Sequence, residues 1–96
     1  MFFDEIGVEL PSLDKVDEQD NPLVVAHFVN GDWDWFVVAG EVMGHGDYYL
    51  FGLVNGIERE LGFFTLNQIR DVGAVLDRDF VPCGVFDIYD DFDLRV

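Results

Sequence analysis

The stretch LVVAHFVNGDWDWFVVAGEVMGHGDYYLFGLVNGIERELGFF, residues 23–64, decides the fold of this chain. It contains the dipeptide Asn-Gly at 30–31 and again at 55–56, each time between two apolar runs. Asn-Gly favours a type I′ turn between antiparallel strands, because both central residues of that turn need positive φ. Together with the glycine-rich loop at 44–47, these turns predict a four-stranded antiparallel meander, with strands at 23–29, 33–42, 48–54 and 57–64.

The strand predicted at 33–42 carries two tryptophans on one face. Because side chains alternate along a strand, one face is expected to hold Trp33, Trp35, Val37 and Ala39. The other is expected to hold Asp34, Phe36, Val38 and Val42. Two tryptophans on one face of a central strand favour core positions. The alternative is an exposed aromatic patch for a partner or a homodimer.

The segment after the meander begins with a helix signal. Thr65 and Gln68 have the spacing of a capping box, which predicts a helix at 66–72 with Gly73 placed to end it. A short fifth strand is expected at 75–80. The tail at 85–94 alternates apolar and acidic residues, and this pattern fits either a short helix or an edge strand.

The chain length of 96 residues suits one domain. We divide it into an acidic lead-in (1–22), the meander (23–64), the helix (65–73) and a short strand with an acidic tail (74–96). In the lead-in, Phe2, Phe3 and Ile6 are expected to dock on the core as one helical turn. The predicted class is α+β, a four- to five-stranded antiparallel meander sheet with one short helix packed on a face.

The charge balance restricts the partners of this protein. Twenty acidic residues stand against five basic ones, which gives a net charge of −15 at pH 7. Nucleic-acid binding depends on cations that neutralise phosphates, and anionic membranes attract the same cations. We therefore expect no direct binding of nucleic acid, no membrane association and a basic partner.

Cysteine usage and the N-terminus bear on the compartment. The single Cys83 has no partner for an intramolecular disulfide. The first residues lack the basic and apolar regions of a signal peptide, and no apolar run approaches the roughly 18 residues of a membrane span. We expect a cytoplasmic protein of a host cell.

Several sequence words resemble a family of small proteins of unknown function carried by plasmids, phages and integrated elements. The matching words are His27-Phe28, Trp33-Asp34-Trp35-Phe36, FGLVNG at 51–56, ELGFFTL at 60–66 and LDRD at 76–79. The family's corresponding words look like W-T-W-Y/F, F-G-x-V-x-G, E-L-G-Y-F-S-L and E-R-D. The chain departs from them at Asp34, where threonine is usual, and in its acidic flanks. The resemblance implies a mobile-element origin and brings no catalytic residues.

Candidate catalytic and metal sites are weak. Cys83 with His27 or His45 lacks a nucleophile motif, and Glu58 with Glu60 fits a solvated strand face. The acids around 17–21 and 87–93 lack the glycine and distal glutamate of a calcium loop, and zinc would need paired Cys and His. We expect no enzyme, no metal and no cofactor. The arginines at 59, 70 and 78 are expected to pair locally with acids.

The acids are the remaining functional signal, and they gather in three segments. Rows of carboxylates on a strand repeat at about 6.5–7 Å and resemble a ladder of phosphates. Small acidic inhibitors of mobile elements, such as anti-restriction and anti-CRISPR proteins, resemble this chain in size, charge and origin. We therefore predict a non-catalytic mimic that blocks the DNA- or RNA-binding groove of a host defence complex. The predicted contact residues are Asp14, Asp17, Glu18, Asp20, Asp32, Asp34, Asp87, Asp90, Asp91 and Asp93.

Two alternatives remain at this stage. One is a mobile-element accessory protein that binds a basic partner for conjugation or replication control. The other is a salt-adapted protein of unrelated role, although salt adaptation tends to trim the large apolar residues in which this chain is rich.

Overall fold

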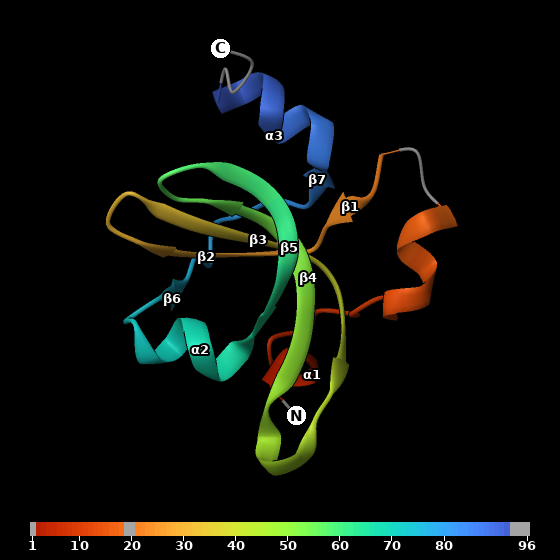
Figure 1. Cartoon of the computed structure of the whole chain (residues 1–96). Helices are drawn as coiled ribbons and strands as arrows, with labels where there is room; N and C mark the ends of the chain where they lie inside the picture. The colour runs from red at the N-terminus through yellow and green to blue at the C-terminus, as the bar shows by residue number, and fades with distance from the viewer. Residues whose placement is uncertain (1, 19–20, 93–96) are drawn as a thin grey trace.

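The computed structural model describes residues 2–18 and 21–92, and within these the side chains at 17–18 and 89–92 are not described. Five strands form one antiparallel sheet in the order β5-β4-β3-β2-β6 (Figure 1). They are β2 (Ala26–Asn30), β3 (Trp33–Val42), β4 (Tyr48–Asn55), β5 (Arg59–Thr65) and β6 (Val75–Leu76). Strands β2 to β5 pair in chain order, so the predicted meander and the α+β class are confirmed. The fifth strand is shorter than predicted.

The two Asn-Gly turns lie where predicted but have other conformations. Asn30 pairs with Trp33 inside the ladder, so the central residues of the first turn are Gly31 and Asp32. Only Gly31 has positive φ, at 58°, as in a type II′ turn. The second turn has three residues between Asn55 and Arg59, and neither Asn55 nor Gly56 has positive φ. The type I′ prediction is therefore wrong at both turns.

A β-bulge in β3 changes which face its later residues occupy. The register between β3 and β4 shifts between Val37 and Ala39. Val38 and Ala39 consequently both join the core on the face of Phe36. The prediction that Ala39 shares a face with Trp35 and Val37 is wrong, because the extra residue of a bulge interrupts the alternation.

The first face of the sheet is covered by two helices, α1 (Phe2–Glu5) and α2 (Leu66–Asp71), which lie below the sheet in Figure 1. Phe3 is buried among Phe28 and Tyr48, so the predicted docking of the N-terminal turn is confirmed. Trp35 is buried on this face, whereas Trp33 at the sheet's end is 41% exposed. The core prediction therefore holds for one of the two tryptophans.

The opposite face is covered by α3 (Val85–Phe92), above the sheet in Figure 1. Val85 and Ile88 of this helix are buried against Phe36 and Leu53. A two-stranded ladder of β1 (Leu23–Val24) with β7 (Cys83–Gly84) holds the start of α3 beside the sheet. The open alternative for the tail is thus resolved as a helix, because residues three apart share one helix face. Apolar partners of this core also come from the 3-10 helix η1 (Leu13–Glu18).

Helix α2 begins at the predicted residue and ends at Asp71, one residue earlier than predicted. The Thr65 hydroxyl accepts a hydrogen bond from the backbone N–H of Gln68 at 3.1 Å, and Gln68 Oε1 accepts one from the N–H of Thr65 at 2.9 Å. This is the predicted capping box. Gly73, at φ 92°, follows the helix in the left-handed conformation that glycine favours.

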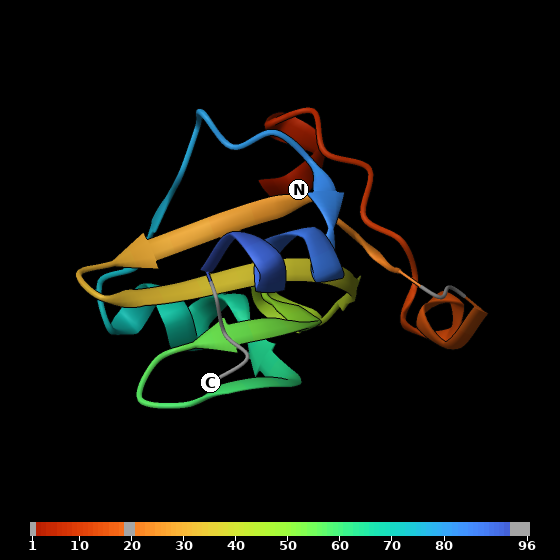
Figure 2. The same ribbon diagram turned by 90° about the horizontal axis from the view of Figure 1, so that it is seen from above.

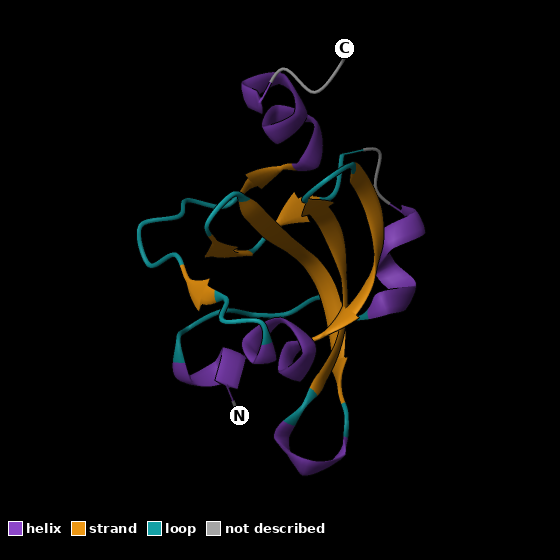
Figure 3. Cartoon of the chain, turned by 60° about the vertical axis from the view of Figure 1, so that its left-hand side comes forward, coloured by secondary structure: helices purple, strands orange, loops and turns teal. Residues whose placement is uncertain are grey.

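The long central strands bend along their length, as Figure 3 shows for the sheet seen from the side. A short 3-10 helix, η2 (Gly44–Gly46), joins β3 to β4. Within the described part of the chain, no helix has the length and apolar character needed to cross a membrane.

Candidate functional site

The three predicted acidic segments lie at separate places on the surface. Asp14 on η1, Asp32 in the β2–β3 turn and Asp87 on α3 all have exposed side chains. Asp14 accepts a hydrogen bond from the Ser12 hydroxyl, and Asp87 accepts one from the N–H of Gly84 at 3.2 Å. These three acids are therefore held at the surface.

The remaining tail and lead-in acids are located only by their backbone. Asp17 and Glu18 belong to η1, and Asp90 and Asp91 belong to α3. The predicted contacts Asp20 and Asp93 lie outside the described residues.

The acidic segments follow one arc across the molecule. Figures 1 and 2 both place the β2–β3 turn and η1 at opposite ends of the sheet, with α3 between them. The molecule measures 40 × 31 × 23 Å along its principal axes. The backbones of these three segments thus follow one line across the molecule, which we call the acidic arc (η1, the β2–β3 turn and α3).

Asp34, although predicted as a contact residue, is bound inside a polar cluster. Its Oδ1 lies 2.7 Å from Nε2 of His27, and its Oδ2 accepts a hydrogen bond from Asn55 Nδ2 at 3.2 Å. On the other side of the imidazole, His27 Nδ1 lies 2.8 Å from Oδ2 of Asp77. His27 therefore bridges two carboxylates from β3 and from the segment after β6.

The bridge is tightly packed. The imidazole is stacked on the Phe36 ring, with 4.4 Å between centroids and 7° between planes, and its side chain is only 12% exposed. A neutral imidazole donates one N–H, so only the imidazolium donates to both carboxylates. The hydrogen bond with His27, aided by one from the N–H of Asp79, lowers the pKa of Asp77 below its ordinary value.

This geometry removes support from the catalytic alternative. Both ring nitrogens of His27 lie against carboxylates, so neither is available to take a proton from Cys83. His45 is exposed on η2, and Glu58 and Glu60 are exposed at and after the β4–β5 turn.

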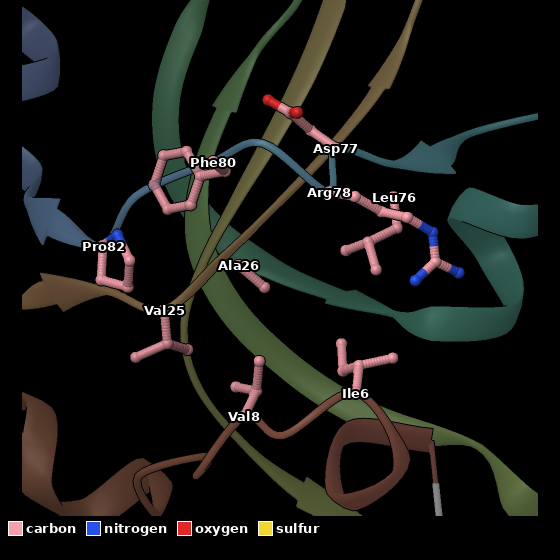
Figure 4. A pocket seen from close by; sticks show the side chains of 9 residues that line it. All are labelled: Ile6, Val8, Val25, Ala26, Leu76, Asp77, Arg78, Phe80 and Pro82. Carbon is pink, nitrogen blue, oxygen red and sulfur yellow. The ribbon is translucent and has the colours of Figure 1, made fainter.

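A hollow of about 210 Å³ beside this bridge, shown in Figure 4, has apolar walls. The carboxylate of Asp77 points away from it. Arg78 lies at its rim, with the guanidinium directed to one side. The arrangement presents apolar side chains and no aligned acid and base. The apolar side chains in the wall are Ile6, Val8, Val25, Ala26, Leu76, Phe80 and Pro82.

The fold also makes an acidic group that sequence reasoning missed. Asp4, Glu9 and Glu41 line one surface hollow near α1 and the end of β3. They come from three segments, and only the tertiary fold brings them together. In Figure 1 these elements lie at the bottom, on the opposite side of the molecule from α3.

Two of the arginines make contacts that the sequence did not predict. The guanidinium of Arg70 lies over the Phe2 ring, 4.5 Å from its centroid. Nη1 of Arg59 is buried, with no hydrogen-bond partner among the described residues. Within the same part of the chain, no group of three His, Cys, Asp or Glu side chains is arranged to hold a metal ion.

Comparison of the chain with protein-family models, with curated proteins and with solved structures yields no match.

Proposed function

We propose that this protein is a non-catalytic inhibitor that mimics nucleic acid and occupies the DNA- or RNA-binding groove of a host defence complex. Its site of action is the host cytoplasm. The observation that carries the proposal is the acidic arc, in which the backbones of three acidic segments follow one line across one side of the molecule. A basic groove would be attracted to that side by long-range electrostatics.

The charge density supports this proposal. A DNA duplex as long as the 40 Å dimension of this protein carries about 24 phosphate charges. The protein carries a net charge of −15. Among the acids whose burial is described, Asp34, Asp47 and Asp77 are half-buried and the others are exposed. The charge is thus of the same order as that of the duplex, and most of it faces solvent.

The first test is a pull-down from host lysate at low salt with tagged protein, followed by excess duplex DNA. We expect capture of one nucleic-acid-binding complex and its release by the DNA. A partner that stays bound in the presence of DNA would contradict competitive mimicry and favour the accessory role. Capture of no specific partner would leave the acids with a solubilising role.

Two matched variants locate the contact surface. The first replaces Asp14, Asp32 and Asp87 on the acidic arc by Asn. The second replaces Asp4, Glu9 and Glu41 by the corresponding amides. Both remove three exposed charges, but only the first acts on the arc. We expect the first variant to lose partner binding by about tenfold or more and the second to bind nearly as the natural protein does, because complementary charges act mainly at the interface. Equal losses would place the contact elsewhere.

A further inference from the structure

Trp33 and Trp35 form an aromatic hollow at the end of the sheet that carries the β2–β3 turn. The hollow has a volume of about 300 Å³ and is lined by Asn30, Trp33, Trp35 and Val72. The two indole rings are stacked with 5.9 Å between centroids and 24° between planes. Helix α2 ends at Asp71, and Trp33 remains 41% exposed. The hollow is therefore open to solvent.

The walls of the hollow are held in place before any ligand arrives. The Trp33 ring lies against Gly56, so closely that a Cβ at this glycine would collide with the ring. The Asn30 side chain donates to the carbonyl oxygen of Val72 at 2.6 Å, which ties the end of β2 to the segment after α2. A preorganised site loses less conformational entropy on binding than a flexible one.

The two indole rings make the hollow suited to a cation. Indole faces carry the negative part of the ring quadrupole and attract cations. Two exposed carboxylates, Asp32 and Asp71, directly precede Trp33 and Val72 in the chain. None of the four lining residues is basic, and Arg70, one residue before Asp71, lies over Phe2 instead. A cation in the hollow would therefore have to come from another molecule.

We propose that the Trp33–Trp35 hollow binds an arginine side chain of the partner protein. A planar guanidinium stacks on an indole face and also matches carboxylate geometry, which a lysine ammonium does not do. A phosphate-bearing ligand would be repelled by the net charge of −15. This inference rests on the basic partner of the proposed function, and it adds a specific anchor to the general attraction of the acidic arc.

The test uses the isolated protein and a blocked tripeptide, acetyl-Gly-Arg-Gly-amide, followed by NMR. The matched probe has citrulline in place of arginine, which keeps the shape and removes the charge. We expect the arginine peptide to shift the indole N–H signals of Trp33 and Trp35 in a saturable way. The citrulline peptide should leave them nearly unchanged. Equal shifts with both peptides would overturn the selection of a cation.

The variant Trp33→Leu tests the aromatic wall. Its affinity for the arginine peptide, measured from the Trp35 and Asn30 signals, should fall about fivefold, since a cation–π contact contributes about 1 kcal/mol. Trp33→Phe keeps a ring and should retain most of the affinity. The backbone amide spectrum reports whether each variant is folded. If Trp33→Leu does not fold, the test compares the peptide affinities of Trp33→Phe and Asp32→Asn, and the affinity of Asp32→Asn should be the lower. Undiminished affinity in both Trp33→Leu and Asp32→Asn would refute the hollow as the site.

The two proposals fail separately. Loss of peptide binding in Trp33→Leu without any DNA-sensitive partner in the lysate would support the hollow and refute mimicry. A DNA-sensitive partner that binds Trp33→Leu as tightly as the natural protein, together with peptide binding that ignores Trp33, would do the reverse.

Discussion

At the scale of single residues, the bridge between Asp34, His27 and Asp77 ties the stability of the fold to individual side chains. Asp34 is half-buried and bonded to both His27 and Asn55. Hydrogen bonds to charged groups contribute about 1.5–3 kcal/mol each. We expect Asp34→Asn to lower the free energy of unfolding by about 2 kcal/mol, measured by urea denaturation.

The matched control for Asp34→Asn is Asp32→Asn, two residues earlier in the same hairpin. Asp32 is exposed, so its replacement should change the stability by less than about 0.5 kcal/mol. Both variants remove one negative charge, so relief of general repulsion affects them equally. Similar losses of unfolding free energy in the two variants would show that the bridge contributes no more to stability than an exposed carboxylate does.

The same bridge makes stability depend on pH through Asp77. Its folded pKa lies below the ordinary value, so between the two values the unfolded chain binds more protons than the folded chain. The stabilisation is therefore complete above about pH 4 and is lost as the pH falls through the folded pKa. We expect the stability difference between the natural protein and Asp77→Asn to shrink from neutral pH to about pH 3. A difference that stays constant over this range would contradict the bridge.

The contact between His27 and Asp77 could not be predicted from the sequence. Asp34 was recognised as an acid in the first hairpin, but His27 and Asp77 are 50 residues apart and meet only because β6 pairs with β2. Asp4, Glu9 and Glu41 likewise line one hollow only because the tertiary fold brings their segments together. Local patterns report which residues are acidic, whereas their pairing depends on strand order.

At the scale of elements, the bulge in β3 explains why one of two paired glycines has no room for a side chain and the other has. Gly52 of β4 and Gly62 of β5 are cross-strand neighbours. A Cβ at Gly52 would collide with the carbonyl oxygen of Phe36, where the β3–β4 register is about to shift. A Cβ at Gly62 would meet no atom within 4 Å.

We therefore expect opposite outcomes for the two alanine variants. Gly52→Ala should lose about 3 kcal/mol of unfolding free energy, because backbone atoms must move to admit the methyl group. Gly62→Ala should be unchanged or more stable by up to about 1 kcal/mol, since alanine has less conformational freedom to lose on folding. Thermal or urea unfolding of both proteins checks this. A Gly52→Ala protein as stable as Gly62→Ala would mean that the two strands can separate at little cost.

The elements were predicted better than the details of their connections. The meander and the capping box follow from local sequence signals, and both are present. The Asn-Gly signal located the turns but gave the wrong type. The reason is that Asn30 and Asn55 use their side-chain amides in tertiary hydrogen bonds, to Val72 and to Asp34, and remain in the ladder.

At the scale of the whole molecule, net charge was known from composition, but its arrangement was not. The acidic arc depends on α3 lying between η1 and the β2–β3 turn, and the sequence left the tail open between a helix and a strand. Docking of α3 through Val85 and Ile88 settles this arrangement. The fold thus brings the backbones of three separated acidic segments into one line across the molecule.

This charge predicts opposite effects of salt on folding and on partner binding. Acids at −15 repel one another more strongly in the compact state than in the unfolded chain. Raising NaCl from about 0.01 to 0.3 M shortens the screening length from about 30 Å to less than 8 Å. We expect the melting temperature to rise over this range, while the affinity for the basic partner falls, because screening weakens repulsion within the protein and attraction between the proteins alike.

The variant with Asp14, Asp32 and Asp87 replaced by Asn separates the two effects. It should melt at a higher temperature than the natural protein in low salt and show a smaller rise with added salt. Its partner affinity should also depend less on salt, because fewer charges lie on the arc. Differential scanning calorimetry and a binding titration over one salt series measure both quantities. A melting temperature that falls with added salt would contradict this prediction, because it would mean that attractive ion pairs within the folded protein outweigh the repulsion between its acids.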